Sequence, residues 1–368
     1  MRVIAAAPGR FEVEAVAAGH DGRELARIAV ALGARYAAVA APSSLEALKE
    51  GLRGHPIEAG AGDAAIVEAA TRDDDLVVSG IVGAAGLAPT YAAVAAGKTV
   101  ALANKESLVC AGAALTNAAR ASGATILPMD SEHNAIFQAI GDRDPATVVS
   151  MILTASGGPF REWSAARIAA ATPEEALAHP NWSMGPKISV DSASLMNKGL
   201  ELIEARHLFD LAPERLSVLV HPQSIVHGMV GFADGSMIAG LARPDMRTPI
   251  AHCLAYPDRI DAGISPPDLA ALRRLTFEEV DEERFPALRL ARAAMFEGDG
   301  ATAALNAANE VAVAGFLVRR IGFGAMAGIV ERTIDQMRAA NELKSSSGLA
   351  EALAIHHVAR ERARRLLA

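Results

Sequence analysis

Cysteine is almost absent from this sequence of 368 residues, which contains only Cys110 and Cys253. Two cysteines so far apart exclude a disulfide scaffold and a cysteine-based zinc site, and they are typical of a reducing cytoplasm. Basic residues are also scarce, because 35 Lys and Arg stand against 43 Asp and Glu, a net charge of −8. Proteins that bind nucleic acid or anionic membranes usually carry a basic excess, so we expect neither partner.

Long apolar runs and aromatic side chains are scarce as well. The N-terminus lacks the apolar stretch of a signal peptide. Residues 76–97 carry no charge, but glycines and a proline interrupt them, so they predict a strand, a turn and a buried helix and not a membrane span. Aromatics make up 4% of the chain, so its cores must consist of Ala, Val, Leu and Ile. The length predicts two or three domains.

The first third of the chain alternates short β-rich runs with alanine-rich helical runs. This order predicts a parallel, Rossmann-like sheet with right-handed crossovers, in which ligands bind at the carboxyl ends of the strands. We expect strands at 11–17, 36–40, 76–79 and 99–103, and helices at 23–32, 45–52, 87–96 and 106–122.

The middle of the chain mixes strands with one long helix, and the end is helical throughout. The predicted fold class is therefore α/β, with a Rossmann-like domain at 1–129, an α+β domain at 130–260, a linker at 261–286 and a C-terminal helical bundle at 287–368. In the α+β domain we expect a helix at 194–209 and strands at 148–154, 188–190, 216–220, 225–230 and 237–241; a strand at 125–129 precedes it.

Two carboxylates follow the strand predicted at 125–129. Asp130 and Glu132 are two residues apart, so in an extended chain both would point the same way. Convergent carboxylates repel unless a cation lies between them, and oxygen ligands suit Mg²⁺ or Mn²⁺. The alternative is an ordinary solvated acidic turn.

A second polar group lies in 191–201. Asn197 and Glu201 share a helix face, and Lys198 lies three residues before Glu201. Ser192 lies near the start of the predicted helix, where hydroxyls and free N–H groups favour a phosphate. The alternative is a helix cap followed by a routine Lys–Glu pair.

A third polar group, Asn104–Glu106, follows the strand predicted at 99–103 and would face the crevice where substrates bind. Its alternative is helix capping.

A lid is predicted at 156–186. Its first residues, Ser156–Phe160, are rich in glycine, and its second part, His179–Gly185, contains a tryptophan and ends in glycine. Such a segment is typical of a hinged lid that closes over a reaction. The alternative is an ordinary long loop.

Taken together, these strings closely resemble the 1-deoxy-D-xylulose 5-phosphate reductoisomerase family. The resemblance covers almost the whole chain. The matching strings are ALANKESLVCAG at 101–112, DSEHNAIFQ at 130–138, LTASGGPFRE at 153–162, HPNWSMGPKISVDSASLMNKGLELIEA at 179–205, HPQSIVHGMV at 221–230 and RPDMRTPIAHCLAYPDR at 243–259.

The resemblance implies an activity in non-mevalonate isoprenoid synthesis. A divalent metal, Mg²⁺ or Mn²⁺ with Co²⁺ as an alternative, would promote rearrangement of 1-deoxy-D-xylulose 5-phosphate to a branched aldehyde. NADPH would then reduce this aldehyde to 2-C-methyl-D-erythritol 4-phosphate. The family also implies a cytoplasmic homodimer whose small-molecule substrate is a sugar phosphate.

The resemblance also implies a role for each matched residue. Asp130, Glu132 and Glu201 would be the metal ligands, and Lys105 and His179 would complete the catalytic group. The substrate and its phosphate would be held by Lys105, Ser131, Glu132, Ser156, His179, Ser192, Asn197, Lys198 and Glu201. The cofactor would be contacted by Gly19, His20, Asp21, Asn104, Glu106 and Gly185, and the lid would carry Trp182 and Met184.

One departure from the family concerns the N-terminus. The family opens with a strand and a glycine-rich phosphate loop, whereas Met1–Pro8 aligns with the helix after that loop. On the dimensions of a dinucleotide-binding fold, roughly 15–20 residues are expected to be absent. We therefore expect weak NADPH binding and a helical or disordered segment at 1–8. Asp21 stands where the family often carries asparagine, in the part that would recognise the ribose 2′-phosphate.

Three other functions remain as alternatives at this point. The chain could bind metal and substrate and rearrange it, yet reduce it poorly or not at all. It could also be a non-catalytic binder of phosphate and metal. A generic Rossmann-type dehydrogenase would not need the three carboxylates.

Overall fold

The computed structural model describes residues 1–182, 184–344 and 348–367, which form two compact units. Helix α6 (Glu106–Ser122) begins in the second unit and ends in the first. The first unit comprises 1–104, 117–129 and 247–264, and the second comprises 105–116, 130–246 and 265–368. The compact units thus divide the chain differently from the predicted domain boundaries.

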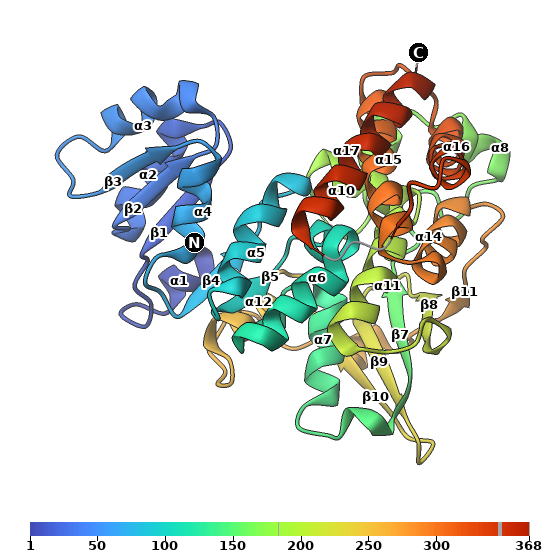
Figure 1. The fold of residues 1–368 in the computed structure, drawn as a ribbon. Coiled ribbons are helices and arrows are strands. Elements are labelled where there is room, and N and C mark those ends of the chain that lie inside the picture. Colours follow the sequence, from blue (N-terminus) through green and yellow to red (C-terminus); the bar gives the residue numbers. More distant parts are fainter. Residues whose placement is uncertain (183, 345–347, 368) are drawn as a thin grey trace. The chain divides into compact units, whose positions relative to one another are not determined.

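The first unit contains two parallel three-stranded sheets, with the orders β1-β2-β3 and β4-β5-β6 (Figure 1). Their parallel pairing confirms the predicted Rossmann-like class. The strands are β1 (Ala15–Ala18), β2 (Tyr36–Val39), β3 (Glu58–Ala61), β4 (Leu76–Ser79), β5 (Thr99–Leu102) and β6 (Thr125–Pro128). The helices are α1 (Arg2–Ala6), α2 (Gly22–Leu32), α3 (Leu45–Gly51), α4 (Asp63–Thr71), α5 (Leu87–Ala95) and α12 (Arg247–Ala255).

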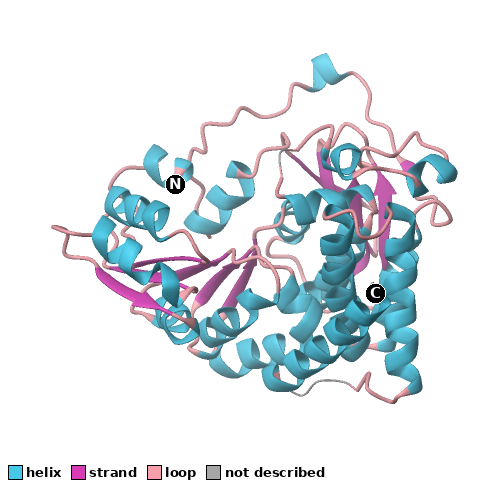
Figure 2. Cartoon of the chain, turned by 90° about the horizontal axis from the view of Figure 1, so that it is seen from above, coloured by secondary structure: helices cyan, strands magenta, loops and turns pink. Residues whose placement is uncertain are grey.

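Strand β2 shows why helices must cover both faces of its sheet (Figure 2). Its four residues are all buried, and successive side chains point to opposite faces. Ala37 and Val39 share a core with α2 and α3, whereas Tyr36 and Ala38 share one with α4. An apolar strand buried on both sides is typical of parallel sheets.

Residues from both ends of this unit's sequence lie against each other. Residues 2–6 form helix α1, which confirms the expected helical segment, and α1 contacts α12. The Sγ atom of Cys253, on α12, donates a hydrogen bond to the backbone oxygen of Pro128 at 3.3 Å. Residues 247–264 therefore belong to the first unit, although most of them were expected in the α+β domain.

The second unit is built on a five-stranded sheet with the order β10-β9-β7-β8-β11. Strands β7 and β8 are parallel, and the other pairs are antiparallel. Helix α7 (Ser131–Ile140) packs on β9 and β10. The strands are β7 (Val148–Ala155), β8 (Leu216–Val220), β9 (Val226–Phe232), β10 (Met237–Leu241) and β11 (Glu278–Glu279).

The C-terminal helices share one continuous core with this sheet and do not form a separate unit. Helix α11 approaches α14 closely, because a Cβ added at Gly199 would lie 2.4 Å from the Cβ of Ala291. The remaining helices are α8 (Ala165–Ala169), α9 (Pro173–Leu177), α10 (Pro186–Ala193), α11 (Met196–Phe209), α13 (Leu269–Leu272), α14 (Pro286–Glu297), α15 (Asp299–Leu317), α16 (Met326–Ala339) and α17 (Leu349–Leu366). Within the described ranges, none of the helices has the length and apolarity that a membrane span requires.

The strand expected at 11–17 begins only at Ala15, one predicted strand is wrong, and two elements were not expected. The strand expected at 188–190 is wrong, because these residues lie in helix α10, which Gly185 caps and Pro186 starts. Proline at the first helical position is pre-organised for a helix. Strand β3 and helix α4 were not expected, because Glu58–Ala61 contains only Glu, Ala and Gly, which are poor strand formers.

Candidate functional site

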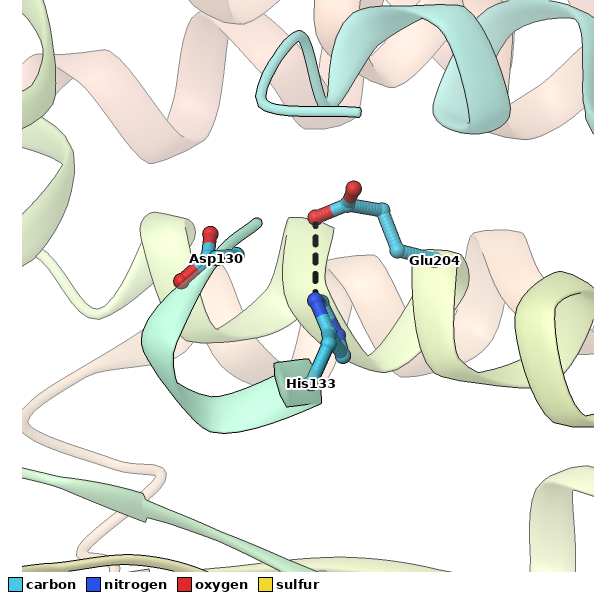
Figure 3. Close-up of side chains that lie close together, drawn as sticks. All are labelled: Asp130, His133 and Glu204. Carbon is cyan, nitrogen blue, oxygen red and sulfur yellow. Dashed lines mark ion pairs between the residues drawn. The ribbon is translucent and has the colours of Figure 1, made fainter. Parts of the chain in front are cut away.

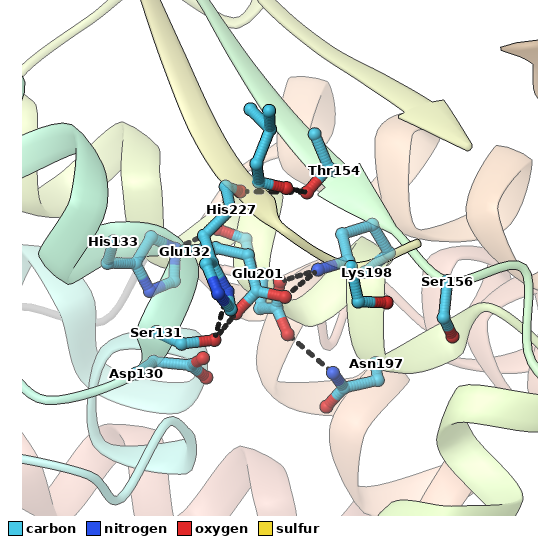
Figure 4. A network of polar contacts seen from close by, with 12 residues as sticks. Asp130, Ser131, Glu132, His133, Thr154, Ser156, Asn197, Lys198, Glu201 and His227 are labelled. Atoms are coloured by element: carbon cyan, nitrogen blue, oxygen red, sulfur yellow. Dashed lines mark hydrogen bonds and ion pairs between the residues drawn. The ribbon is translucent and has the colours of Figure 1, made fainter. Parts of the chain in front are cut away.

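The carboxylates singled out in the sequence converge in the second unit. Asp130 caps helix α7 and Glu132 lies in its first turn, so the expectation of an extended chain is wrong for this segment. Glu201 lies on α11 and is 1% exposed. Carboxylate oxygens of these three residues all lie within 4.8 Å of one another (Figure 4). The convergence therefore comes from two helices and not from one strand.

Two lysines neutralise part of this negative charge. The Lys105 Nζ atom lies 2.8 Å from Asp130 Oδ2 and 3.4 Å from Glu201 Oε1. The Lys198 Nζ atom lies 2.8 Å from Glu132 Oε1 and also pairs with Glu201 Oε2. Three carboxylates thus face two ammonium groups, which leaves one formal negative charge in a buried site.

Asn197 and Ser131 orient the carboxylates further. The Asn197 amide nitrogen donates to Glu201 Oε1, and its oxygen accepts from Lys105 Nζ at 2.9 Å. The Ser131 hydroxyl donates to Glu132 Oε2 at 2.6 Å. Because each carboxylate accepts a hydrogen bond from a side chain of known position, the ligand atoms are pre-organised.

The electrostatics of the site keep both lysines charged. Burial alone would lower the pKa of Lys105 and of Lys198, but the facing carboxylates outweigh it and raise both pKa values. Burial alone would raise the pKa of Asp130, but Lys105, His133 and hydrogen bonds together outweigh it, and the pKa lies well below its usual range. Burial raises the pKa of Glu201 to about 7, and the charge of Glu132 acts in the same direction.

This donor set fits a hard divalent cation. Its ligands are oxygens only, from two glutamates and one aspartate, which suits Mg²⁺ or Mn²⁺ better than zinc. A cation bound there would remove the repulsion that raises the pKa of Glu201.

His179 and Ser156 lie in direct contact next to this cluster. The backbone N–H groups of Asn181 and Trp182 donate to His179 Nδ1 at 3.1 and 2.9 Å, so Nδ1 accepts and Nε2 carries the hydrogen. His179 Nε2 lies 3.0 Å from Ser156 Oγ, which also accepts from the N–H of Gly158 at 3.1 Å. Burial lowers the pKa of His179, so its ring is neutral at pH 7. The Ser156 hydroxyl, having accepted twice, can donate its hydrogen to a ligand.

Gly158 brings the Ser156 segment against Ser192. Its φ is +65°, and an added Cβ would lie 2.9 Å from the backbone oxygen of Ser192. Ser192 lies in the last turn of α10, and Leu195, in the left-handed region with φ +61°, leads into α11. Backbone strain of this kind is concentrated at functional sites. The structure thus places both serines beside the helix that carries Asn197.

Contacts of the predicted lid hold it against the loop after β8. The Asn181 Nδ2 atom donates to the backbone oxygen of Pro222 at 3.0 Å and to Ser224 Oγ at 2.9 Å. The Trp182 ring lies edge-on to the His227 ring, with centroids 6.3 Å apart. Closure of this segment over a substrate stays a prediction.

The end of the predicted lid leads into α10. Gly185 caps this helix, and the backbone oxygen of Met184 accepts a hydrogen bond from Ser189 Oγ at 3.5 Å. Ser183, which the lid prediction includes, lies outside the described residues.

Of the other predicted cofactor residues, the first unit carries all but Glu106, which lies in the second. Gly19, His20 and Asp21 follow the carboxyl end of β1, and Asp21 Oδ1 accepts from the backbone N–H of Glu24 at 3.0 Å, which caps α2. A Cβ added at Gly19 would meet no atom within 4 Å. Open space beside a glycine, at a strand end and a helix N-terminus, fits the ribose and phosphate part of a dinucleotide.

Asn104 and Glu106 follow β5 and are both buried. The Asn104 Nδ2 atom donates to the backbone oxygens of Ile81 and Gly83, so it braces the loop after β4. Glu106 Oε1 lies 3.0 Å from Lys187 Nζ. Their contact with a cofactor stays a prediction.

Sequence reasoning missed three buried residues of the site, namely His133, Glu204 and His227. His227 Nδ1 lies 3.1 Å from Ser131 Oγ, and its Nε2 donates to the backbone oxygen of Ala242 at 3.3 Å. A histidine inside an otherwise apolar strand was the available signal. Glu204 follows Glu201 by three residues, a spacing that places both on one helix face.

Three family models match the chain. The model described as 1-deoxy-D-xylulose 5-phosphate reductoisomerase matches residues 1–112, and that of its C-terminal domain matches 126–209. A further model, described as the DXP reductoisomerase C-terminal domain, matches residues 241–362. Together these models account for most of the sequence.

Similar proteins carry the same family name. The 1-deoxy-D-xylulose 5-phosphate reductoisomerase of Rhodopseudomonas palustris (strain BisB18) is 55% identical, with 100% of this chain and 90% of the relative covered. That of Afipia carboxidovorans is 54% identical, with 98% and 88% covered.

Solved structures agree with this likeness. The reductoisomerase from Zymomonas mobilis in complex with NADPH has a TM-score of 0.90 and 48% identity over 97% of this chain and 92% of that one. A DOX-P reductoisomerase in complex with NADPH, fosmidomycin and magnesium has a TM-score of 0.96 and 41% identity over 100% and 94%.

Proposed function

The chain belongs to the 1-deoxy-D-xylulose 5-phosphate reductoisomerase family, and from that premise we propose that it converts 1-deoxy-D-xylulose 5-phosphate into 2-C-methyl-D-erythritol 4-phosphate. The reaction consists of a metal-dependent rearrangement and a reduction by NADPH, and it serves non-mevalonate isoprenoid synthesis. The observation that carries the proposal is the buried convergence of Asp130, Glu132 and Glu201 with two lysines.

We assign Asp130, Glu132 and Glu201 to hold the divalent cation, Mg²⁺ or Mn²⁺ with Co²⁺ as an alternative. When bound, the cation acidifies and polarises the hydroxy-ketone, so that its C–C bond can break without a strong base. Lys105, which already reaches Asp130 and Glu201, supplies a fixed positive charge beside the substrate oxygens.

The substrate phosphate is assigned to the hydroxyl and amide groups around the start of α11. Ser156 and Ser192 come together through the close approach at Gly158. The Ser156 hydroxyl, which accepts from His179 Nε2, can donate its hydrogen, and Asn197 and Lys198 offer further donors. Charge-assisted hydrogen bonds of this kind hold phosphates firmly.

The cofactor NADPH is assigned to Gly19–Asp21, Asn104, Glu106 and Gly185. The open space at Gly19 and the N-terminus of α2 support the part of this assignment that concerns the ribose. The carboxylate of Asp21 would repel a ribose 2′-phosphate, so Asp21→Asn is expected to lower the KM for NADPH while leaving the KM for NADH unchanged. A parallel change in both would contradict the assignment.

A direct test is the loss of NADPH absorbance with 1-deoxy-D-xylulose 5-phosphate and Mn²⁺. We expect turnover by the parent chain and by Asp142→Asn, a matched control because Asp142 is exposed and outside the site, but none by Asp130→Asn. Turnover by Asp130→Asn at the parental rate would contradict the metal assignment.

A second candidate is rearrangement without competent reduction. The observation that favours it is the division of the cofactor unit into two separate sheets, in which β1 and β4 are edge strands. Nuclear magnetic resonance of the reaction mixture separates the candidates, because the second predicts accumulation of the branched aldehyde and little consumption of NADPH.

A homodimer in the cytoplasm completes the proposal. Strand β10 is the last strand of its sheet, and Met237 and Leu241 on it are 53% and 40% exposed. An apolar edge strand can pair with its own copy about a two-fold axis. Light scattering should give the mass of two chains, and Met237→Lys should shift it towards one. Both cysteines are buried and neither forms a disulfide, which suits a reducing compartment.

A further inference from the structure

A buried histidine–glutamate pair, His133 and Glu204, lies close to Asp130 (Figure 3). His133 Nδ1 and Glu204 Oε2 face each other at 3.8 Å. The two residues are 0% and 3% exposed, and neither atom has a hydrogen-bond partner among the described residues. A buried polar group without a partner costs about 1–3 kcal/mol, so this arrangement calls for an explanation.

The opposite side of the histidine ring is held by the helix that carries Glu201. His133 Nε2 lies 2.8 Å from the backbone oxygen of Glu201, and since a carbonyl only accepts, Nε2 donates. The orientation of the ring is therefore fixed, and Nδ1 must point at Glu204. One hydrogen can be shared between Nδ1 and Oε2 only when the two atoms come closer, because 3.8 Å exceeds hydrogen-bond distance.

The pair lies one helical turn from the carboxylate cluster on each of two helices. His133 is three residues after Asp130 on α7, and Glu204 is three residues after Glu201 on α11. Residues three apart lie on the same face of a helix. A contact between His133 and Glu204 therefore sets the separation of the two helices exactly where they present their carboxylates.

We propose that Glu204 is a positioning residue, which acts through His133 to hold Glu201 at the correct distance from Asp130 and Glu132. It does not touch the substrate. This inference rests on the proposed function, because it takes these three carboxylates as the metal ligands. Groups that orient ligands without binding the metal typically change metal affinity by about 10- to 100-fold.

The test is Mn²⁺ binding to the full chain without substrate or NADPH, followed by electron paramagnetic resonance of free Mn²⁺. The parent is expected to bind one ion. Glu204→Met, which keeps the side-chain length but removes the polar contact, should weaken binding by about 10-fold or more. Glu204→Gln should stay within about 3-fold of the parent, because its amide N–H can donate to His133 Nδ1.

The chain offers a control in a second, half-buried glutamate that faces a histidine. Glu310 Oε2 lies 3.6 Å from His356 Nε2, in α15 and α17, away from the cluster. Glu310→Met should destabilise the chain without changing Mn²⁺ affinity. If Glu204→Met does not fold, Glu204→Asp, which only shortens the side chain, should still weaken binding by about 10-fold.

The outcomes separate this inference from the function it rests on. If the parent binds no Mn²⁺, the metal assignment itself is wrong. Parental affinity in Glu204→Met or Glu204→Asp overturns the positioning role alone, as does an equal loss in Glu310→Met. Two ions per chain, or a loss of one of them in Glu204→Gln, would make Glu204 a metal ligand and also overturn it.

Discussion

The two units of the molecule differ in the size of their apolar cores and in the charged side chains that they bury. In the first unit the strands are four residues long, and its cores are small clusters such as the one that Leu48 shares with α2 and β2. Its strands β1 and β4 are sheet edges, and Val78 on β4 is 53% exposed. In the second unit one core runs from β7 to α17, and charged side chains such as Glu201 are buried beside it.

This difference shows where the molecule can support buried charge. Removing a charge from water costs several kcal/mol even when it is paired. The large continuous apolar core of the second unit offsets that cost. We therefore expect the first unit to be the less stable of the two, and the second to hold its carboxylates in place before any ligand binds.

The largest effect tests the chemistry of the second unit without disturbing its core. Asp130→Asn and Glu201→Gln each remove one anionic ligand, so kcat should fall by about 1,000-fold or more, which corresponds to about 4 kcal/mol. The chain should still fold, because both substitutions keep the side-chain volume. Steady-state kinetics and thermal unfolding are the measurements, with Glu297→Gln on the surface as the control. Turnover within a few-fold of the parent at saturating Mg²⁺ would show that the cluster is structural.

The next effect concerns stability and separates the units directly. Both tryptophans, Trp163 and Trp182, lie in the second unit, and all three tyrosines lie in the first, so each unit has its own spectroscopic probe. Leu48→Ala should lower the unfolding free energy of the first unit by about 2–5 kcal/mol, because Leu48 is fully buried.

In urea, Leu48→Ala should move the tyrosine transition and leave the tryptophan transition in place. Leu200→Ala, equally buried on α11, is the matched control and should move the tryptophan transition instead. If the tyrosine and tryptophan transitions shifted together in both variants, the two units would unfold as one. The expected difference in stability between the units would then be wrong.

The comparison also explains how much of the fold the sequence could predict. Strand β7, which is rich in β-branched and buried apolar residues, was expected within one residue of its bounds, because local preference and burial agree there. Strand β3 was missed because glycine disfavours strands, yet the packing of Tyr36 against β3 requires a glycine at position 60. A Cβ at Gly60 would lie 2.0 Å from the Tyr36 hydroxyl. Such a contact between distant residues cannot be predicted from the strand propensity of the local sequence.

The residues of the candidate site also fall into a group that the sequence could predict and a group that it could not. Asp130, Glu132 and Glu201 were found because their residue types and family strings are distinctive, and the structure brings them together. The role of His133 and Glu204 depends on how α7 and α11 face each other, which no single segment encodes. Sequence reasoning therefore identified groups that carry charge at the site and missed those that position them.

A smaller effect is expected for the phosphate contact. Lys198→Ala should lower kcat/KM by about 2 kcal/mol, or about 30-fold, as expected for a charge-assisted hydrogen bond to a phosphate. Lys49→Ala on the exposed surface of the first unit is the control and should be neutral. An effect well below 1 kcal/mol would make Lys198 a structural partner of Glu132 and Glu201 only.

The last prediction concerns how the stability of the second unit depends on pH. Burial lowers the pKa of His207 and of His227 in the second unit, so the folded state holds both rings neutral, whereas the unfolded chain binds protons below about pH 6.5. Each of these rings therefore makes the second unit less stable as the pH decreases from 7 to 5.5, by at most about 1.4 kcal/mol per pH unit, whereas Glu201, with its pKa raised to about 7, acts in the opposite direction. The midpoint of the tryptophan transition in urea, followed against pH, gives the sum of these contributions. The variant His207→Gln should reduce the slope by one group, and a slope that stays unchanged in this variant would show that His207 is not among the groups held neutral.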